Sequence, residues 1–132
     1  MTEPMVRDFM TKSPRTIGVD QTLEKARRMM IDSRIRHLPV LKAGQLVGVL
    51  SDRDIEMVES FKDVDATQVT IEEAYTPEPY SVEPETPLTE VCREMMSRKY
   101  GSALVVDKKN RLVGIFTWID ALRALTQILP NH

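Results

Sequence analysis

The amino-acid sequence predicts a mixed α/β fold made of two β-α-β-β-α repeats. First, identical or similar residues recur at a separation of 65 or 66 positions through the 132-residue chain. Second, each half carries apolar residues at helical spacing, followed by two short runs rich in Val, Leu and Ile. Third, GVLSDRDI (48–55) and GIFTWIDA (114–121) share a glycine, two apolar residues, a hydroxyl residue and an aspartate in the same order. A unit of about 60 residues buries little surface alone, so the two units are expected to share a core.

Matched pairs of residues define the repeat. The separation rises from 65 to 66 between KAGQ (42–45) and DKKNR (107–111), which indicates a one-residue insertion in a turn. The pairs are Pro14 and Pro79, Ile17 and Val82, Leu23 and Leu88, Met30 and Met95, Leu46 and Leu112, Gly48 and Gly114, Ser51 and Thr117, and Asp54 and Asp120.

Each repeat is expected to open on a short extended piece, at 16–19 and 81–82, which leads into a helix. In the second repeat Thr86 is the expected N-cap and Pro87 the first helical residue, because proline suits that position. The expected apolar faces of the two helices are Leu23, Ala26, Met29 and Met30, and Leu88, Val91, Cys92, Met95 and Met96.

Two strands follow in each repeat, at 37–41 and 46–51 and again at 102–107 and 111–117. The connection from the first strand through the helix to the next strand should be parallel and right-handed. The two later strands are close enough in sequence for a hairpin.

The second helix of each repeat is expected to begin at the hydroxyl residue, Ser51 or Thr117. The predicted domains are residues 6–65 and 71–129. The segment that joins them has no glycine or serine, so close packing of the two halves is expected.

Composition narrows the functional classes. Hydrophobic residues make up 42% and charged residues 29%, which is typical of a globular protein. The net charge of -2 does not favour a nucleic-acid surface, and no apolar run is long enough to span a membrane. The single cysteine, Cys92, is expected to be a small buried hydrophobe rather than a reactive thiol. Together with an N-terminus that lacks the apolar segment of a signal peptide, these features predict a cytoplasmic protein.

The order of motifs resembles a tandem pair of CBS domains, also called a Bateman module. The resemblance rests on two copies of G-h-h-[ST]-x-x-D (h, apolar; x, any residue), with RHLPV (36–40) in the first repeat and GSALVVD (101–107) in the second, and runs from about Val6 to Leu129. It implies two repeats with pseudo-twofold symmetry and clefts between them that bind adenosine-containing ligands: AMP, ADP, ATP, S-adenosylmethionine or NAD. It also implies a stand-alone regulatory module that forms a homodimer and acts on an unidentified protein.

The hydroxyl and acidic residues of the motif have two compatible interpretations. Ser51 with Asp54, and Thr117 with Asp120, have the spacing of a helix capping box. In CBS domains the aspartate accepts hydrogen bonds from ribose hydroxyls, for which a carboxylate has several acceptor positions. We therefore expect the hydroxyl residue to cap the helix while the aspartate binds ribose.

The resemblance implies further ligand residues, which are combined across the repeats. Backbone groups before the first strand read the edge of adenine, and basic residues before the next strand contact phosphate. Because Arg36 and His37 have no basic counterparts in the second repeat, the cleft of Asp120 is expected to favour phosphate. The expected sets are Asp120 with Thr16, Ile17, Arg36 and His37, and Asp54 with Ser81, Val82, Gly101 and Ser102, with Pro39 and the capping hydroxyls Ser51 and Thr117 as further ligand residues.

Several residues keep open alternatives. Gly48 and Gly114 indicate a bulge, tight packing, or the close approach of a ligand or of the partner repeat. Tyr80 either stacks on a base or lies in an exposed turn. Trp118 either covers a hydrophobic interface between subunits or contacts a ligand. Together with the apolar C-terminal helix, the interface role favours a homodimer.

No enzyme is expected, because the sequence has neither a phosphate-binding loop nor a Cys/His cluster with zinc spacing. No metal and no obligatory cofactor is expected. The alternative to nucleotide regulation is a ligand-free dimerisation scaffold in which the two motifs only cap helices.

Overall fold

The computed structural model describes residues 3–61 and 63–130. The chain divides into two compact units. The first unit runs from Arg15 to Pro79, and the second joins the N-terminal segment up to Pro14 to the segment that starts at Tyr80. The units therefore differ from the predicted domains 6–65 and 71–129, which follow the repeat in the sequence rather than the contacts.

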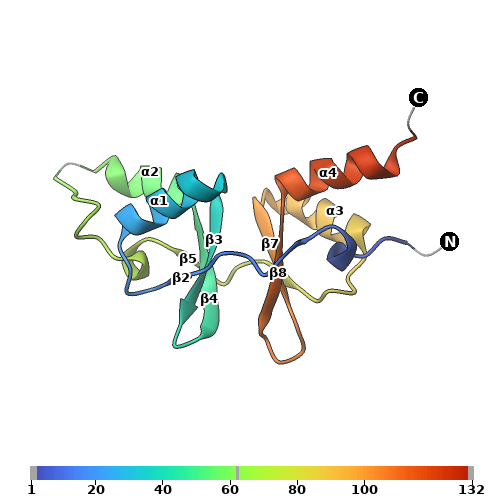
Figure 1. The fold of residues 1–132 in the computed structure, drawn as a ribbon, viewed down its shortest axis with the longest axis horizontal. Coiled ribbons are helices and arrows are strands. Elements are labelled where there is room, and N and C mark those ends of the chain that lie inside the picture. The colour runs from blue at the N-terminus through green and yellow to red at the C-terminus, as the bar shows by residue number, and fades with distance from the viewer. Residues whose placement is uncertain (1–2, 62, 131–132) are drawn as a thin grey trace. The chain divides into compact units, whose positions relative to one another are not determined.

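The first unit is a four-stranded sheet with two helices on one face (Figure 1). Its strand order is β2-β3-β4-β5, with β2 parallel to β3 and the other neighbours antiparallel. The elements are β2 (Ile17–Gly18), α1 (Leu23–Ser33), β3 (His37–Lys42), β4 (Gln45–Ser51), α2 (Asp52–Glu59), a 3-10 turn (Ile71–Glu73) and β5 (Thr76–Pro77).

The second unit repeats this layout with the strand order β6-β7-β8-β1. Again the first pair is parallel and the other pairs are antiparallel. The elements are a 3-10 turn (Val6–Asp8), β1 (Thr11–Lys12), β6 (Ser81–Val82), α3 (Leu88–Arg98), β7 (Ser102–Val106), β8 (Leu112–Thr117) and α4 (Trp118–Ile128). The mixed α/β class, the parallel crossovers and the hairpins predicted from the sequence are confirmed.

The edge strands β1 and β5 were not predicted, and they change how the units are assembled. The segment before each repeat's first strand completes the sheet of the other repeat: β1 pairs with β8, and β5 pairs with β4. These strands have two residues each, so they carry no period-2 pattern. Each unit therefore takes its fourth strand from the sequence that precedes the other.

The same segments satisfy the first backbone donors of α1 and α3. The N–H of Leu23 donates to the carbonyl of Val69 (3.0 Å), and the N–H of Leu88 donates to the carbonyl of Pro4 (2.8 Å). Helix α3 begins at Leu88 with Pro87 as the N-cap, so the prediction of Thr86 as N-cap is wrong by one residue. Pro87 has an extended ψ of 136°, which keeps it outside the helix.

Each unit has a hydrophobic core of its own; the core that the sequence predicts between the two units stays a prediction. In the first unit α1 and α2 pack on β2, β3 and β4; in the second unit α3 and α4 pack on β6, β7 and β8. Leu50 and Phe116, a matched pair, are fully buried in the two cores. Over the described ranges 3–61 and 63–130, no helix is both long and apolar enough to cross a membrane.

Gly48 and Gly114 are required by the edge strands. A Cβ on Gly48 would lie 2.3 Å from the backbone oxygen of Thr76, and one on Gly114 would lie 2.5 Å from the Sδ of Met10. The ladders of β4 and β8 also shift register beside these glycines. Tight packing and a bulge therefore explain both glycines without a ligand.

Candidate functional site

The first motif forms a capping box at the start of α2. The Asp54 carboxylate accepts a hydrogen bond from the backbone N–H of Ser51 (2.8 Å), and the N–H of Asp54 donates to the Ser51 hydroxyl (3.1 Å). The predicted cap is confirmed. The Asp54 side chain has one further neighbour from β5, because the Thr76 hydroxyl lies 3.3 Å from Oδ1 and 3.4 Å from Oδ2.

In the second motif, at the start of α4, the aspartate again accepts a hydrogen bond from the backbone N–H of the hydroxyl residue, but here the hydroxyl also donates to the carboxylate, which has more partners. The Asp120 Oδ2 accepts hydrogen bonds from the N–H (2.8 Å) and the hydroxyl (3.2 Å) of Thr117. Its Oδ1 accepts from the Thr11 hydroxyl (2.9 Å) and from the guanidinium of Arg123 (2.8 Å). The Asp120 side chain is only 2% exposed, so burial is compensated by these four donors.

His37 and Arg36 lie beside the first motif. His37 opens β3 opposite Ser51, and the backbone carbonyl of Arg36 accepts a hydrogen bond from the N–H of Asp52 (3.0 Å). Burial lowers the pKa of His37, although the carboxylates of Asp52 and Asp54 act in the opposite direction. The Arg36 side chain is 81% exposed and lies 4.0 Å from the Asp52 carboxylate.

The residues expected to read adenine differ in their accessibility. The side chains of Ile17 and Val82 are buried in the two cores, which leaves their backbone groups for any contact with a base. Thr16 is half-buried and Ser81 is exposed. Pro39 is fully buried within β3.

Gly101 and Ser102 occupy in the second unit the positions of Arg36 and His37. Ser102 is buried and pairs with Thr117 across β7 and β8, as His37 pairs with Ser51. The second motif therefore has no titratable group at this position.

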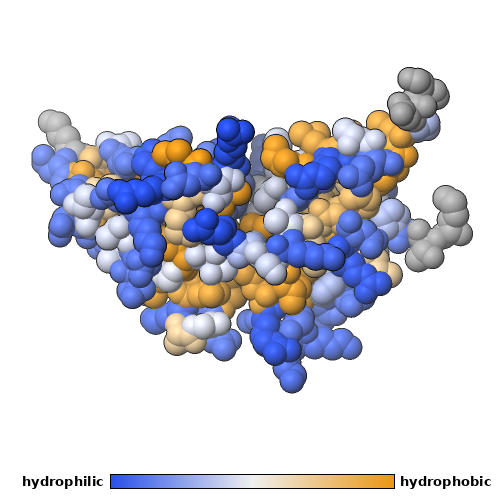
Figure 2. Space-filling view, in the orientation of Figure 1, coloured by the Kyte–Doolittle hydropathy of each residue, from blue (hydrophilic) through white to orange (hydrophobic). Residues whose placement is uncertain are grey.

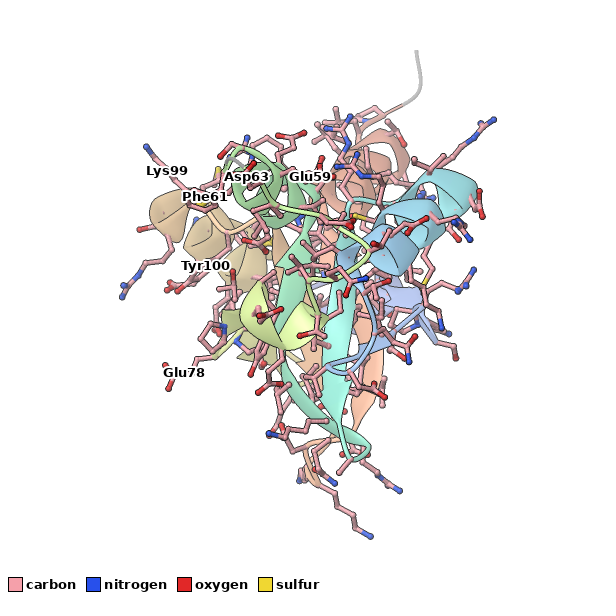
Figure 3. All side chains as sticks on the ribbon, turned by 90° about the vertical axis from the view of Figure 1, so that its left-hand side faces the viewer. Glu59, Phe61, Asp63, Glu78, Lys99 and Tyr100 are labelled. Atoms are coloured by element: carbon pink, nitrogen blue, oxygen red, sulfur yellow. The ribbon has the colours of Figure 1, made fainter. Side chains whose placement is uncertain are left out.

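An aromatic group beside α3 and α4 was only partly anticipated. Tyr80 and Tyr100 stack with ring centroids 5.1 Å apart, and the indole N–H of Trp118 donates to the Tyr100 carbonyl (3.2 Å). Tyr100 follows the C-terminal end of α3 (Figure 3). Tyr80 therefore stacks on a tyrosine of its own unit, and burial raises its pKa. No sequence motif predicts that Tyr80 stacks on Tyr100.

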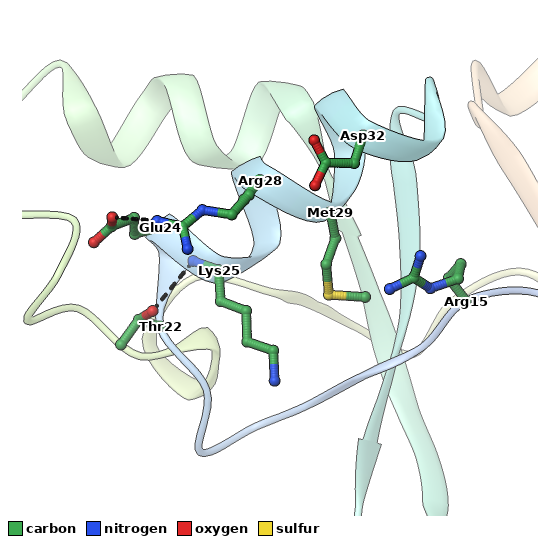
Figure 4. A pocket seen from close by; sticks show the side chains of 7 residues that line it. All are labelled: Arg15, Thr22, Glu24, Lys25, Arg28, Met29 and Asp32. Atoms are coloured by element: carbon green, nitrogen blue, oxygen red, sulfur yellow. Dashed lines mark hydrogen bonds and ion pairs between the residues drawn. The ribbon is translucent and has the colours of Figure 1, made fainter.

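A shallow pocket of about 360 Å³ lies along α1, but none of the predicted ligand residues lines it (Figure 4). Its cations have partners: Arg28 is 2.9 Å from Glu24, and the Lys25 amine donates to Gln21. The backbone N–H of Lys25 donates to the Thr22 hydroxyl, which caps α1. Within the described part of the chain, no group of three or more His, Cys, Asp or Glu side chains could hold a metal ion.

Helix α4 exposes a broad apolar face (Figure 2). The exposed residues of α4 and of the turn after it are Trp118, Ile119, Leu122, Leu125, Ile128 and Leu129, each at least 50% exposed.

Cys92 is partly buried on α3, and burial raises the pKa of its thiol.

Two structures of CBS domain proteins with bound ligands are similar to this chain. The CBS domain pair of protein MJ0100, in complex with 5′-methylthioadenosine and S-adenosyl-L-methionine, has a TM-score of 0.86 at 28% identity and covers 96% of this chain and 98% of its own. CBSX2 in complex with AMP has a TM-score of 0.84 at 28% identity and covers 94% of this chain and 97% of its own.

Sequence comparisons agree with the fold. A CBS domain-containing protein of Dictyostelium discoideum is 30% identical over 135 residues, which cover 95% of this chain and 93% of that protein. The chain also spans 64% of the chloroplastic protein CBSX1 of Arabidopsis thaliana and 25% of a homoserine O-acetyltransferase of Methanococcoides burtonii, each at 29% identity. The CBS domain family model matches residues 6–58 and 71–127. The chain belongs to the CBS domain family and carries two CBS domains in tandem.

Proposed function

We propose that this chain is a regulatory module that binds an adenosine-containing ligand of the AMP, ADP or ATP type. The proposal is supported by the two similar structures, which hold AMP in one case and S-adenosyl-L-methionine with 5′-methylthioadenosine in the other. All three ligands contain adenine and a ribose with two neighbouring hydroxyl groups. A site for this family of ligands therefore needs an acceptor for a diol.

The Asp54 carboxylate is the observation that carries the proposal. It is held at the N-terminal end of α2 by the Ser51 N–H, and in the described part of the chain its one other donor is the hydroxyl of Thr76, at 3.3 Å and 3.4 Å from the two oxygens. A carboxylate in this position can accept two ribose hydroxyls without giving up its capping bond. The proposed ligand residues are Thr16, Ile17, Arg36, His37, Pro39, Ser51, Asp54, Ser81, Val82, Gly101, Ser102, Thr117 and Asp120; that a ligand draws on both repeats stays a prediction.

Regulation would follow from a difference in ligand affinity between conformations. A ligand that binds one arrangement more tightly shifts the population toward it. The exposed face of α4 supports a homodimer in which this shift could be read by a target protein. The cytoplasmic location stays a prediction from composition.

A ligand-free dimerisation scaffold is the second candidate. It is favoured by the same face of α4, and by the bonds from Ser51 and Thr117 to the two aspartates, which form without a ligand. In that case both aspartates act only at helix ends.

Thermal unfolding with separate additions of AMP, ADP, ATP, S-adenosylmethionine and NADH tests the two candidates. A ligand that binds only the native state raises the midpoint with its concentration. AMP should raise it more than 2′-deoxyadenosine monophosphate, which lacks one hydroxyl of the diol. The absence of a shift with every ligand would favour the scaffold.

The oligomeric state is measured separately by light scattering. A double variant, Leu122→Glu with Leu125→Glu, should lower the mass from dimer to monomer, because it places two charges on the apolar face of α4. A wild-type monomer whose mass does not change with concentration would contradict the homodimer.

A further inference from the structure

The acceptor positions of Asp120 are already filled. An ionised carboxylate offers about four lone-pair positions. Asp120 receives two hydrogen bonds from Thr117 on Oδ2, and one each from Thr11 and Arg123 on Oδ1. Hydroxyls of a ribose could reach this carboxylate only if one of these donors left.

Asp54 has acceptor positions to spare. Its strong bond is to the Ser51 N–H at 2.8 Å, and among the described residues the one other donor is the Thr76 hydroxyl, shared between the two oxygens at 3.3 and 3.4 Å. The residue three positions after Asp54 is Met57, where Arg123 stands three positions after Asp120. Met57 has no charged group to compete for the carboxylate.

Of the two donors on Oδ1 of Asp120, Arg123 is the one that can leave. Thr11 belongs to β1, which is fixed by its ladder with β8. The Arg123 side chain is 51% exposed, so its guanidinium can leave the carboxylate for water, whereas Asp120 is 2% exposed and loses a charge-assisted hydrogen bond. A ligand that displaces Arg123 from Asp120 therefore binds more weakly.

We infer that Arg123 determines which aspartate binds the ribose, by acting as a latch, that is, by occupying the Asp120 carboxylate through its ion pair. The inference rests on the proposed function. Arg123 competes with the ribose hydroxyls for Asp120, so the nucleotide binds first where Asp54 supplies the acceptor. This order is the reverse of the one predicted from Arg36 and His37, which placed the better phosphate site with Asp120.

Calorimetric titration with AMP tests the latch, with each aspartate site measured in turn. The Asp54→Ala variant leaves only the Asp120 site, and adding Arg123→Met to it should raise the affinity for AMP about tenfold. The matched change Met57→Arg in the wild-type chain should lower the affinity of the first site by about the same factor. Met57 is 67% exposed, so the new side chain has room, and thermal unfolding of each variant checks the fold.

The outcomes separate the latch from the proposed function. An unchanged or lower AMP affinity after Arg123→Met would overturn the latch, a lower one showing that Arg123 contacts the ligand. Two AMP molecules bound with equal affinity to the wild-type chain would also overturn it, while the proposed function would stand. If neither the wild-type chain nor its Arg123→Met variant binds AMP or S-adenosylmethionine, the proposed function fails and the latch fails with it.

Discussion

The two units have the same strand order, and in each an aspartate accepts a hydrogen bond from the backbone at the start of a helix, yet the two aspartates have different surroundings. Asp54 keeps a half-buried carboxylate with one close partner, whereas Asp120 is 2% exposed and accepts four hydrogen bonds. The backbone plan of the repeat is therefore shared, and its chemistry is set by a few neighbours such as Thr11 and Arg123. A repeated motif need not perform the same task twice.

The largest expected effect is the loss of stability when a fully buried side chain in either core is truncated. Phe116→Ala should lower the free energy of unfolding by about 3–5 kcal/mol, and Leu50→Ala by about 2–5 kcal/mol, because both side chains are fully buried and leave cavities. Urea denaturation followed by circular dichroism measures the loss. A change below about 1 kcal/mol in either variant would show that its core relaxes far more than such sites usually do.

Replacing Gly48 and Gly114 by alanine compares how tightly the edge strands β5 and β1 pack on their sheets. Gly48→Ala should cost about 1–3 kcal/mol, because its Cβ would meet the backbone of β5, which cannot rotate away. Gly114→Ala should cost less, since its nearest neighbour is the flexible side chain of Met10. Denaturation of both variants gives the order, and a greater loss for Gly114→Ala would show that β1 is the more rigid edge.

The two aspartates should also differ in stability. Asp120→Ala should lower the free energy of unfolding by about 1–3 kcal/mol, because it leaves the Thr11 hydroxyl and the Thr117 N–H without their acceptor. Asp54→Ala should cost about 1 kcal/mol, the usual net value of one hydrogen bond, because it removes the acceptor of the Ser51 N–H. Thermal and urea unfolding without ligand measure both. Equal losses would mean that the extra donors of Asp120 contribute nothing.

The smallest expected effect is a pH dependence of the free energy of unfolding, which arises from His37 in the first unit and has no counterpart in the second. The pKa of His37 lies below its ordinary value of 6.5 in the folded chain, so the unfolded chain binds the proton first as the pH falls. The free energy of unfolding should therefore fall from about pH 7 down to the lowered pKa of His37 and change no further below it. In the second unit Ser102 occupies this position and contributes no such slope.

The measurement is urea denaturation between pH 7.5 and pH 5, in a His132→Gln background that leaves His37 as the only histidine. His37→Gln in that background should flatten the slope. The lowered pKa values of Asp65, held by Thr67, and of Asp107, held by Arg111, act near or below pH 3.8 and so fall outside this range. A slope that survives His37→Gln would assign it to another group.

The repeat made most of the fold predictable from the sequence. Matched apolar positions located four helices and the central strands, because burial on one face imposes a regular spacing. The two-residue strands β1 and β5 were not predicted, because so short a segment shows no alternation of apolar and polar residues. Their pairing also depends on contacts between residues distant in sequence. At the candidate site the caps were predictable from local spacing, whereas the bonds from Thr11 and Thr76 depend on those same edge strands.

The position of β1 has a consequence for the order in which the protein is synthesised. The first unit is continuous, so its sheet can close once Pro77 has left the ribosome. The second unit needs Thr11 to pair with Ile115, a separation of 104 residues. Thr11 is therefore synthesised 104 residues before the residue with which it pairs. Because contacts between distant residues form slowly, closure of the second sheet should limit the rate at which the whole chain becomes native.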